Sequence, residues 1–229
     1  MGYEIFEGIR ADHYDKNIRI LFPQYEFLLS LLGVIFGKNT GLVKNPNLLI
    51  VGSGTGAEIE HVHKHLPYVH MTGVDISPEM VKIAESKLIK SVPGSSYELI
   101  TGSVYDLPKE KYYDGATLLL VLHFLPDDGS KLSLLKEISS RLNSSALLVL
   151  SDIFDYDGLF NYNLDLLKAY LISQRKDKEV VHQLMEHFKN DIHYISETRT
   201  FDLLMEAGFI NVKKILQSTI YGTWLCEKA

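Results

Sequence analysis

Three glycines and one aspartate are the residues whose spacing is best suited to chemistry: Gly52, Gly54, Gly56 and Asp75. The glycines lie between an apolar run, Leu48 to Val51, and a helical pattern. Glycine permits positive φ and lets a ligand approach the backbone closely, and a helix start just beyond it presents free N–H groups. Asp75 ends the next apolar run, about 20 residues after the glycines. An acid at that position can accept hydrogen bonds from both hydroxyls of a ribose. The stretch therefore predicts a nucleoside-binding βαβ unit.

The glycine spacing fits two templates. One is Gly52-x-Gly54-x-Gly56, and the other is Gly52-x-Gly54-x-x-Ala57, which a dinucleotide site could use. The second template makes an NAD-binding oxidoreductase one possible enzyme class for this chain. A nucleoside sensor without catalytic activity is the alternative among binding proteins.

Polar residues also end the later predicted strands, where open parallel sheets bind their ligands. Ser103, with Val104, follows the strand expected over residues 97–101, and it could donate to an adenine ring nitrogen or cap the next turn. His123 follows the strand expected over 116–122, and Asp152 follows that over 146–150. Histidine titrates in the range of a general base, so His123 is the candidate base, with Asp152 as the second candidate.

The elements that must position these residues alternate along the chain. Helices are expected over 56–66, 77–90, 127–142 and 196–207, and the last two strands, 210–216 and 219–226, are expected to form a closing hairpin around Gln217-Ser218. Continuous apolar strands separated by helices predict an α/β fold with a mostly parallel sheet covered on both faces.

Two further segments have helical patterns outside this core. The first, residues 18–36 interrupted by Pro23, predicts two helices over the mouth of the sheet, with Tyr14, Tyr25 and Arg19 able to face the site. The second predicts a helical pair over 159–172 and 180–188. Aromatic and polar residues there are candidates to contact a substrate: Tyr156, Tyr162, Tyr170, His182, His187 and His193.

Composition limits the number of domains, the kinds of partner and the cellular location that the chain can have. A chain of 229 residues with 46% hydrophobic content can bury one substantial core, and we expect one domain. The net charge of −6 without a Lys/Arg block disfavours a nucleic-acid substrate, and no Cys/His cluster has zinc spacing, so no metal is expected. A single Cys226 cannot form an internal disulfide, and the apolar stretch Phe27 to Phe36 is too short to cross a bilayer. We expect a cytoplasmic protein with a small-molecule substrate, no membrane partner and self-association as a homodimer.

Four segments carry a resemblance to a known family: IVGSGTGAE, GVDISPEMVKIAE, ELITGSVYDLP and YYDGATLLLVLHFLPDD. They resemble the class I S-adenosylmethionine-dependent methyltransferases, and the resemblance covers roughly residues 10 to 227. It implies a Rossmann-like methyltransferase fold, with a seven-stranded mostly parallel sheet, a C-terminal antiparallel hairpin and helical lid additions. The expected parts are an N-terminal helical cover (1–45), a cofactor-binding core (46–154), a helical insertion (155–195), and a closing helix with the hairpin (196–229).

The resemblance also implies S-adenosylmethionine as cofactor and assigns roles to residues. The glycine turn bends around the methionine part, the acid after the second strand binds the ribose, and residues after the third strand flank adenine. The cofactor-binding positions are then Gly52, Ser53, Gly54, Thr55, Gly56, Asp75, Ile76, Ser103, Val104, Leu120, Tyr14 and Tyr25. The chain departs from the family at Ile50 and at Ser103, where the family often has acids.

The N-terminal segment YDKNIRILFPQYEFLL resembles a subgroup that includes small-molecule methyltransferases and the carboxy-S-adenosylmethionine synthases of tRNA modification. The expected function is methyl transfer to a small organic acceptor. Carboxy-S-adenosylmethionine synthesis is the nearest alternative. That chemistry needs a cation for the added carboxylate, preferably a bidentate arginine, and Arg19, Arg175 and Arg199 are available.

Overall fold

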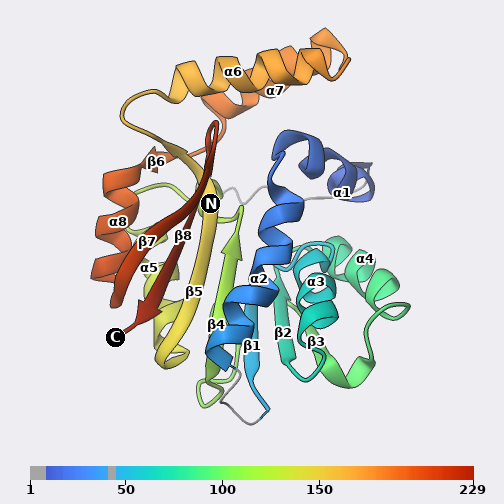
Figure 1. Cartoon of the computed structure of the whole chain (residues 1–229), viewed down its shortest axis with the longest axis vertical. Helices are drawn as coiled ribbons and strands as arrows, with labels where there is room; N and C mark the ends of the chain where they lie inside the picture. The colour runs from blue at the N-terminus through green and yellow to red at the C-terminus, as the bar shows by residue number, and fades with distance from the viewer. Residues whose placement is uncertain (1–8, 41–44) are drawn as a thin grey trace.

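A computed structural model describes residues 9–40 and 45–229 of the chain, and it confirms the α/β fold (Figure 1). Seven strands form a continuous sheet in the order β3-β2-β1-β4-β5-β8-β7, parallel throughout except for β8, which is antiparallel to both of its neighbours. The strands of this path are β1 (Asn47–Val51), β2 (His70–Asp75), β3 (Tyr97–Thr101), β4 (Tyr113–Leu119), β5 (Leu142–Asp155), β7 (Phe209–Ser218) and β8 (Tyr221–Lys228).

The helices cover both faces and one end of this sheet. They are α1 (Ile9–Leu21), α2 (Tyr25–Thr40), α3 (Ala57–His65), α4 (Pro78–Leu88), α5 (Ser130–Ser140), α6 (Phe160–Ser173), α7 (Lys178–Asn190) and α8 (Glu197–Glu206). Three short 3₁₀ helices lie between them: η1 (Gly94–Ser96), η2 (Val104–Asp106) and η3 (Leu122–Phe124).

Strand β1 lies in the centre of the sheet, and its side chains alternate between two cores. Leu48 and Ile50 pack into the cluster that also contains residues of α2 and α3, whereas Leu49 and Val51 pack into the cluster of α5 and α8. All four are buried. Because both faces of the strand are covered, its sequence is uniformly apolar rather than alternating.

The predicted helix starts at two serines are confirmed. Ser77 caps α4 by accepting from the Met80 N–H at 3.3 Å, with Pro78 at the first helical position. Ser196 caps α8 by accepting from the Arg199 N–H at 3.1 Å. Each serine satisfies one of the N–H groups that a helix start leaves unpaired, so the local sequence fixes where the helix begins.

Several predicted bounds differ from the structure. The two-residue strand β6 (Ile195–Ser196), which was not expected, pairs with β5 and gives the sheet an eighth strand. Strand β4 ends at Leu119 rather than at residue 122, because Leu120 takes a φ of 58° and the chain turns into η3. Helix α5 begins at Ser130, after the Asp127–Asp128 pair, and the closing hairpin turns at Thr219 and Ile220 rather than at Gln217 and Ser218.

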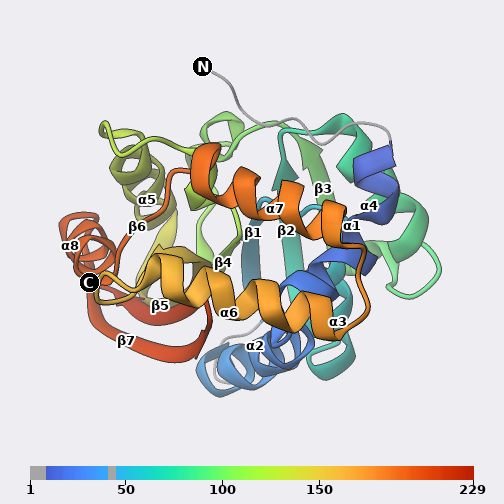
Figure 2. The same cartoon turned by 90° about the horizontal axis from the view of Figure 1, so that it is seen from above.

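The expectation that both N-terminal helices lie over the mouth of the sheet is wrong for α2. Its side chains Leu28, Leu29, Leu32 and Phe36 are all 0% exposed, because the helix lies along the face of the sheet beside α3 (Figure 1). Helix α1 and the α6–α7 pair do lie at the carboxyl ends of the strands, as the view from above shows (Figure 2).

Among the described residues, no single helix is long and apolar enough to cross a membrane, and α1 and α2 reach that composition only as a pair bent by 94°.

Candidate functional site

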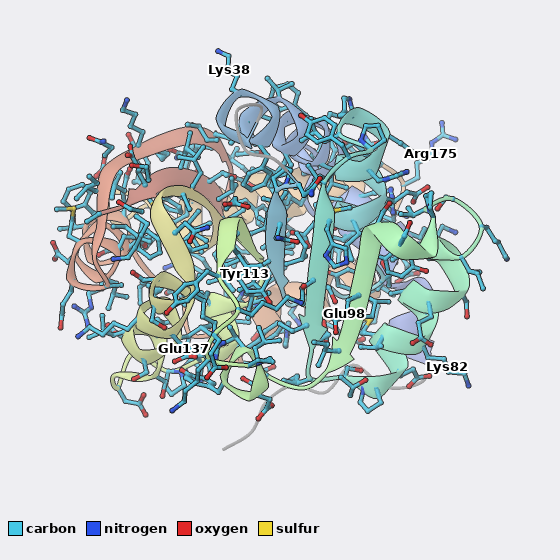
Figure 3. All side chains as sticks on the ribbon, turned by 90° about the horizontal axis from the view of Figure 1, so that it is seen from below. Lys38, Lys82, Glu98, Tyr113, Glu137 and Arg175 are labelled. Carbon is cyan, nitrogen blue, oxygen red and sulfur yellow. The ribbon has the colours of Figure 1, made fainter. Side chains whose placement is uncertain are left out.

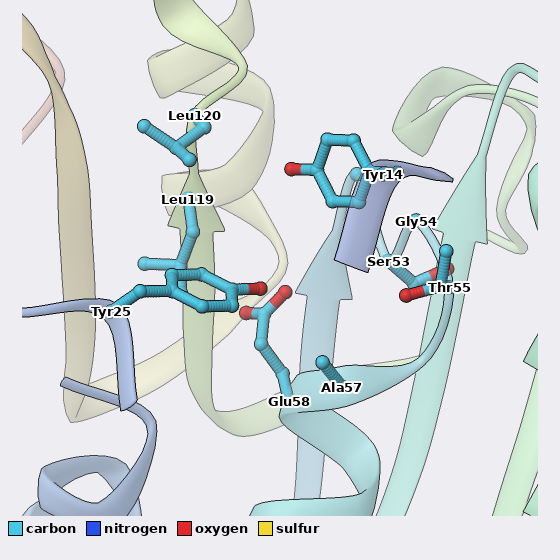
Figure 4. A pocket seen from close by; sticks show the side chains of 10 residues that line it. Tyr14, Tyr25, Ser53, Gly54, Thr55, Ala57, Glu58, Leu119 and Leu120 are labelled. Atoms are coloured by element: carbon cyan, nitrogen blue, oxygen red, sulfur yellow. The ribbon is translucent and has the colours of Figure 1, made fainter. Parts of the chain in front are cut away.

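Two adjoining cavities open at the carboxyl ends of the parallel strands. The larger has a volume of about 580 Å³ and is lined by the ends of β1, β2 and β4, the start of α4, η2 and the start of α5. The smaller cavity lies between the glycine turn, α1 and α2 (Figure 4). Five residues line both cavities: Tyr14, Gly52, Gly54, Leu119 and Leu120.

The glycine turn has the geometry that its composition predicts. Gly52, Gly54 and Gly56 have φ values of 72°, 50° and 79°. A Cβ on Gly52 would lie 2.3 Å from a methyl carbon of Val121, so the protein itself excludes a side chain there. The nearest protein atom to a Cβ on Gly54, apart from its chain neighbours, would be the Gly52 carbonyl oxygen, at 4.0 Å. That side of the turn is therefore open for a ligand.

Asp75 lies at the end of β2 with both carboxylate oxygens directed by the backbone. Oδ2 accepts from the Gly54 N–H at 2.8 Å, and Oδ1 accepts from the Ser77 N–H at 2.9 Å. Burial raises the pKa of Asp75, and these two hydrogen bonds partly oppose the shift. A carboxylate has about four acceptor sites, so each oxygen can still accept one ribose hydroxyl.

Ser103 both caps a turn and lines the larger cavity. Its backbone N–H donates to Asp106 Oδ2 at 2.8 Å, and its hydroxyl oxygen accepts from the Tyr105 N–H at 3.4 Å. The hydroxyl proton is not used in this capping box and can be donated to a ring nitrogen. The two roles foreseen for Ser103 are therefore compatible.

The predicted cofactor positions divide between the two cavities. The larger is lined by Gly52, Gly54, Asp75, Ile76, Ser103, Val104, Leu120 and Tyr14, and the smaller also by Ser53, Thr55 and Tyr25. Their contact with a cofactor remains a prediction. Gly56 lines neither cavity: it caps α3, and a Cβ there would lie 3.0 Å from Leu88 of α4, so its role is in packing.

Glu58 is a site residue that the sequence analysis missed. It is 4% exposed in the first turn of α3, and its carboxyl group lies in the smaller cavity near the Tyr25 hydroxyl (Figure 4). Burial raises the pKa of Glu58 to about 8; the nearby Thr117 hydroxyl opposes this shift, and the charge of Asp75 adds to it. Its position four residues before the buried Val62, on the apolar side of the helix, is the sequence signal that could have identified it.

Burial and the surrounding acids also raise the pKa of the two tyrosines beside Glu58. For Tyr14 the largest cause is burial, followed by the charges of Glu58 and Asp15. For Tyr25 burial again comes first, followed by Tyr14 and Glu58. Both phenols therefore stay protonated at neutral pH and can donate hydrogen bonds inside the cavity.

The structure contradicts the prediction that His123 and Asp152 face the crevice. Neither lines either of the two cavities; instead His123 Nδ1 donates to Asp152 Oδ1 at 2.6 Å, and Asp152 Oδ2 accepts from the Leu122 N–H at 2.6 Å. The reason is the early end of β4, because the 3₁₀ turn at residues 122–124 carries the imidazole towards β5. Lys131 extends this buried cluster by donating to the carbonyl oxygens of Leu122 and His193 at 2.6 and 2.7 Å. These residues brace the loop after β4.

The candidate substrate residues of the insertion do not line the cavities either. Tyr162, Tyr170 and His182 are exposed, and His182 and His187 line a separate, open pocket along α7. Tyr156 packs under Lys214, whose Nζ is 4.1 Å from the ring centre, and His193 uses its carbonyl oxygen to hold Lys131. The insertion instead presents an apolar side to α1 and the core, through Phe160, Leu164, Leu167, Leu171, Val181, Met185 and Phe188.

The residues present fit S-adenosylmethionine. Gly54 leaves an open approach, Asp75 has acceptor capacity for a ribose, Ser103 has a free donor, and a buried carboxyl oxygen of Glu58 has no partner. When bound there, the cofactor supplies an electrophilic methyl group on a sulfonium. A dinucleotide oxidoreductase fits less well, because the sixth strand in the order of the sheet is antiparallel, whereas the classic dinucleotide fold is parallel throughout.

Comparisons with known proteins agree with this geometry. A family model of a methyltransferase domain matches residues 48–145. A carboxy-S-adenosyl-L-methionine synthase of Campylobacter hominis is 23% identical over 228 residues, covering 99% of this chain and 94% of its own.

Two solved structures share the fold. An O-methyltransferase family protein from Burkholderia thailandensis has a TM-score of 0.68 and 12% identity, covering 96% of this chain, which spans 60% of that protein. Magnesium protoporphyrin IX methyltransferase from Synechocystis, solved with bound S-adenosylmethionine, has a TM-score of 0.63 and 15% identity over 99% of this chain and 88% of its own. Together with the matched domain and the shared fold, these findings support a class I S-adenosylmethionine-dependent methyltransferase.

Proposed function

We propose that this enzyme transfers a methyl group to a small-molecule acceptor. The observation that carries the proposal is the charge of the site: among the described residues, no Lys, Arg or His lines either cavity, whereas Asp75, Asp128 and Glu58 do. Acids and hydroxyls suit a donor whose sulfonium and ammonium groups are both cationic. They do not suit a donor that carries an added carboxylate.

The chain contributes alignment and exclusion of water rather than a catalytic triad. Methyl transfer from a sulfonium is a direct displacement, so holding donor and acceptor in line accounts for much of the rate enhancement. Tyr14 and Leu120 line both cavities beside the glycine turn, and α1, α6 and α7 lie at the carboxyl ends of the strands (Figure 2). His123 is not part of this proposal, because Asp152 holds its ring away from the cavities.

Carboxy-S-adenosylmethionine synthesis is the second candidate, and full-length similarity to such synthases favours it. The three candidate arginines do not support it. Arg19 bonds to Glu26 and to the Asp15 carbonyl oxygen, and Arg199 makes a bidentate pair with Asp127 at 2.9 and 3.0 Å. Arg175 projects from the outer edge of the molecule (Figure 3).

Mass spectrometry of the nucleoside retained by the purified protein separates the two candidates. We expect S-adenosylmethionine or S-adenosylhomocysteine after the protein is denatured and extracted. Recovery of the carboxylated cofactor would instead assign the synthase activity. Transfer of labelled methyl from S-adenosylmethionine to a panel of small phenols, amines and carboxylic acids would then identify the acceptor class, and absence of any turnover would favour the sensor alternative.

We also propose a cytoplasmic homodimer that binds neither nucleic acid nor membrane. The buried, unpaired Cys226 supports a reducing compartment. An exposed apolar stripe on the outer side of α6, formed by Leu159, Tyr162, Leu166 and Tyr170, offers a surface for self-association. Light scattering on the parent and on Tyr162→Glu tests it, and a monomeric parent would contradict it.

A further inference from the structure

The smaller cavity contains a carboxyl group with one buried oxygen that has no hydrogen-bond partner. Oε1 of Glu58 is buried and unpaired, and so is the Thr117 hydroxyl beside it. Ile50, which pairs in register with Thr117 on the neighbouring strand, is 0% exposed and adds only apolar surface. A buried polar group is normally paired, and an unpaired one that lines a cavity is available to a ligand.

The place of this carboxyl group indicates which part of a ligand would reach it. Asp75 and Ser103 in the larger cavity are suited to the ribose and the adenine, so the amino-acid end of the cofactor is directed towards the glycine turn. The two cavities meet at that turn through Gly52 and Gly54. The amino-acid end carries an ammonium and a carboxylate, and the smaller cavity offers Glu58 to the ammonium.

The groups that face Glu58 leave it without a counter-ion. They are the phenols of Tyr14 and Tyr25 from α1 and α2 and the carboxylate of Asp75 from β2, with Asp15 close to both tyrosines. The cations of the adjoining helices are already engaged, because Lys87 bonds to Asp15 and Arg19 bonds to Glu26. An arriving ammonium would therefore be the first cation within hydrogen-bonding reach of Glu58 among the described residues.

We propose that Glu58 is protonated in the free enzyme, loses its proton to bulk water when the cofactor binds, and pairs as a carboxylate with the cofactor's ammonium group. The ammonium keeps its three protons, so binding releases one proton from the protein. The inference rests on the cofactor assignment and adds a residue that recognises the amino-acid end. It predicts that affinity depends on pH only for ligands that carry that end.

Isothermal titration calorimetry with two ligands tests this. S-adenosylhomocysteine carries the amino-acid end, and 5′-methylthioadenosine has the same nucleoside and sulfur without it. For the parent protein, the affinity for S-adenosylhomocysteine should rise by about ten-fold per pH unit well below the Glu58 pKa of about 8 and level off as the pH passes it. Titrations in buffers of different ionisation enthalpy should report the release of about one proton at neutral pH.

Glu58→Gln mimics the protonated side chain, so the fold should be kept, and Glu60→Gln, on the same helix and paired with Lys64, is the matched control. Glu58→Gln should remove the proton release and weaken the binding of S-adenosylhomocysteine about 10-fold to 100-fold at pH 8. Its affinity for methylthioadenosine should equal that of the parent protein. Equal affinity and equal proton release in Glu58→Gln and the parent would overturn the inference. Failure of the parent to bind either ligand would overturn the cofactor assignment and the inference with it.

Discussion

At the scale of single residues, the site depends on backbone conformation as much as on side chains. Gly52 and Gly54 have positive φ, and the N–H of Gly54 fixes one oxygen of Asp75. These positions could be predicted because glycine spacing and an acid about 20 residues later are local signals. Glu58 was missed as a site residue: its helical spacing from Val62 signals only burial, and the tyrosines beside it come from helices that precede it in the chain by more than 30 residues.

Asp75→Ala should weaken the binding of S-adenosylhomocysteine by about 1.5 to 3 kcal/mol, or about 10-fold to 100-fold. The variant loses the acceptors for both ribose hydroxyls and leaves the N–H groups of Gly54 and Ser77 without their present partner. Calorimetric titration measures the loss, and Asp202→Ala, an exposed position on α8, serves as the control. Unchanged affinity in Asp75→Ala would contradict the ribose assignment.

Gly54→Ala should reduce cofactor affinity by about ten-fold or more without an exceptional loss of stability. The new Cβ has only the Gly52 carbonyl oxygen near it, at 4.0 Å, so it would take space left for the ligand, and the positive φ costs about 1 to 2 kcal/mol. Gly158→Ala is a close match, since Gly158 has a φ of 73°, has nothing within 4 Å of a Cβ, and lines neither cavity. Similar unfolding midpoints with affinity lost only at Gly54 would support the assignment; equal affinities would show that the turn is only structural.

At the scale of elements, caps and apolar runs specify the order of helices and strands, and long-range packing specifies what each covers. The starts of α4 and α8 beside Ser77 and Ser196 are read correctly from the sequence. The position of α2 is not, because its apolar pattern would suit a helix over the sheet mouth or along the sheet face equally well. The end of β4 is also missed, because the apolar sequence continues to Leu122 while the backbone already turns at Leu120.

Gly115→Ala tests whether α2 is a permanent layer of the core. A Cβ on Gly115 of β4 would lie 2.7 Å from the ring of Phe36 and 2.9 Å from Leu48, so the ring would have to move. Overpacking of this kind should lower the free energy of unfolding by about 1 to 3 kcal/mol, measured by urea denaturation. Gly94→Ala is the control, since nothing lies within 4 Å of a Cβ there. If the two variants are equally stable, α2 is seated loosely and could move with α1.

At the scale of the whole molecule, the predicted cofactor site lies at the carboxyl ends of the strands, between the sheet sandwich and a cover of helices (Figure 2). Helix α2 belongs to the sandwich, whereas α1 contacts α4 and α6, and α6 packs on α7 (Figure 2). Asp15 of α1 accepts from the Thr55 hydroxyl of the glycine turn and from Lys87 of α4. The cover is thereby attached to the turn that the cofactor must approach. Part of the predicted N-terminal cover, residues 1–8 and 41–44, lies outside the described residues.

Hydrogen exchange with and without S-adenosylhomocysteine should show that the cofactor orders this cover. Amides of Tyr14 to Leu21 and of α6 and α7 should gain protection when the ligand binds. Ligand contacts at Thr55, Glu58 and Tyr14 would hold α1 on the glycine turn, and α1 in turn contacts α6. Amides of Leu28 to Phe36 in α2 should be equally protected in both states, since their side chains are completely buried against the sheet, and they provide the internal control. Asp15→Asn, which weakens the ion pair with Lys87, should reduce the gain in amide protection in α1 and leave the protection of α2 unchanged. Equal protection of α1, α6 and α7 in the two states would mean that these helices pack permanently and that the ligand enters without displacing them.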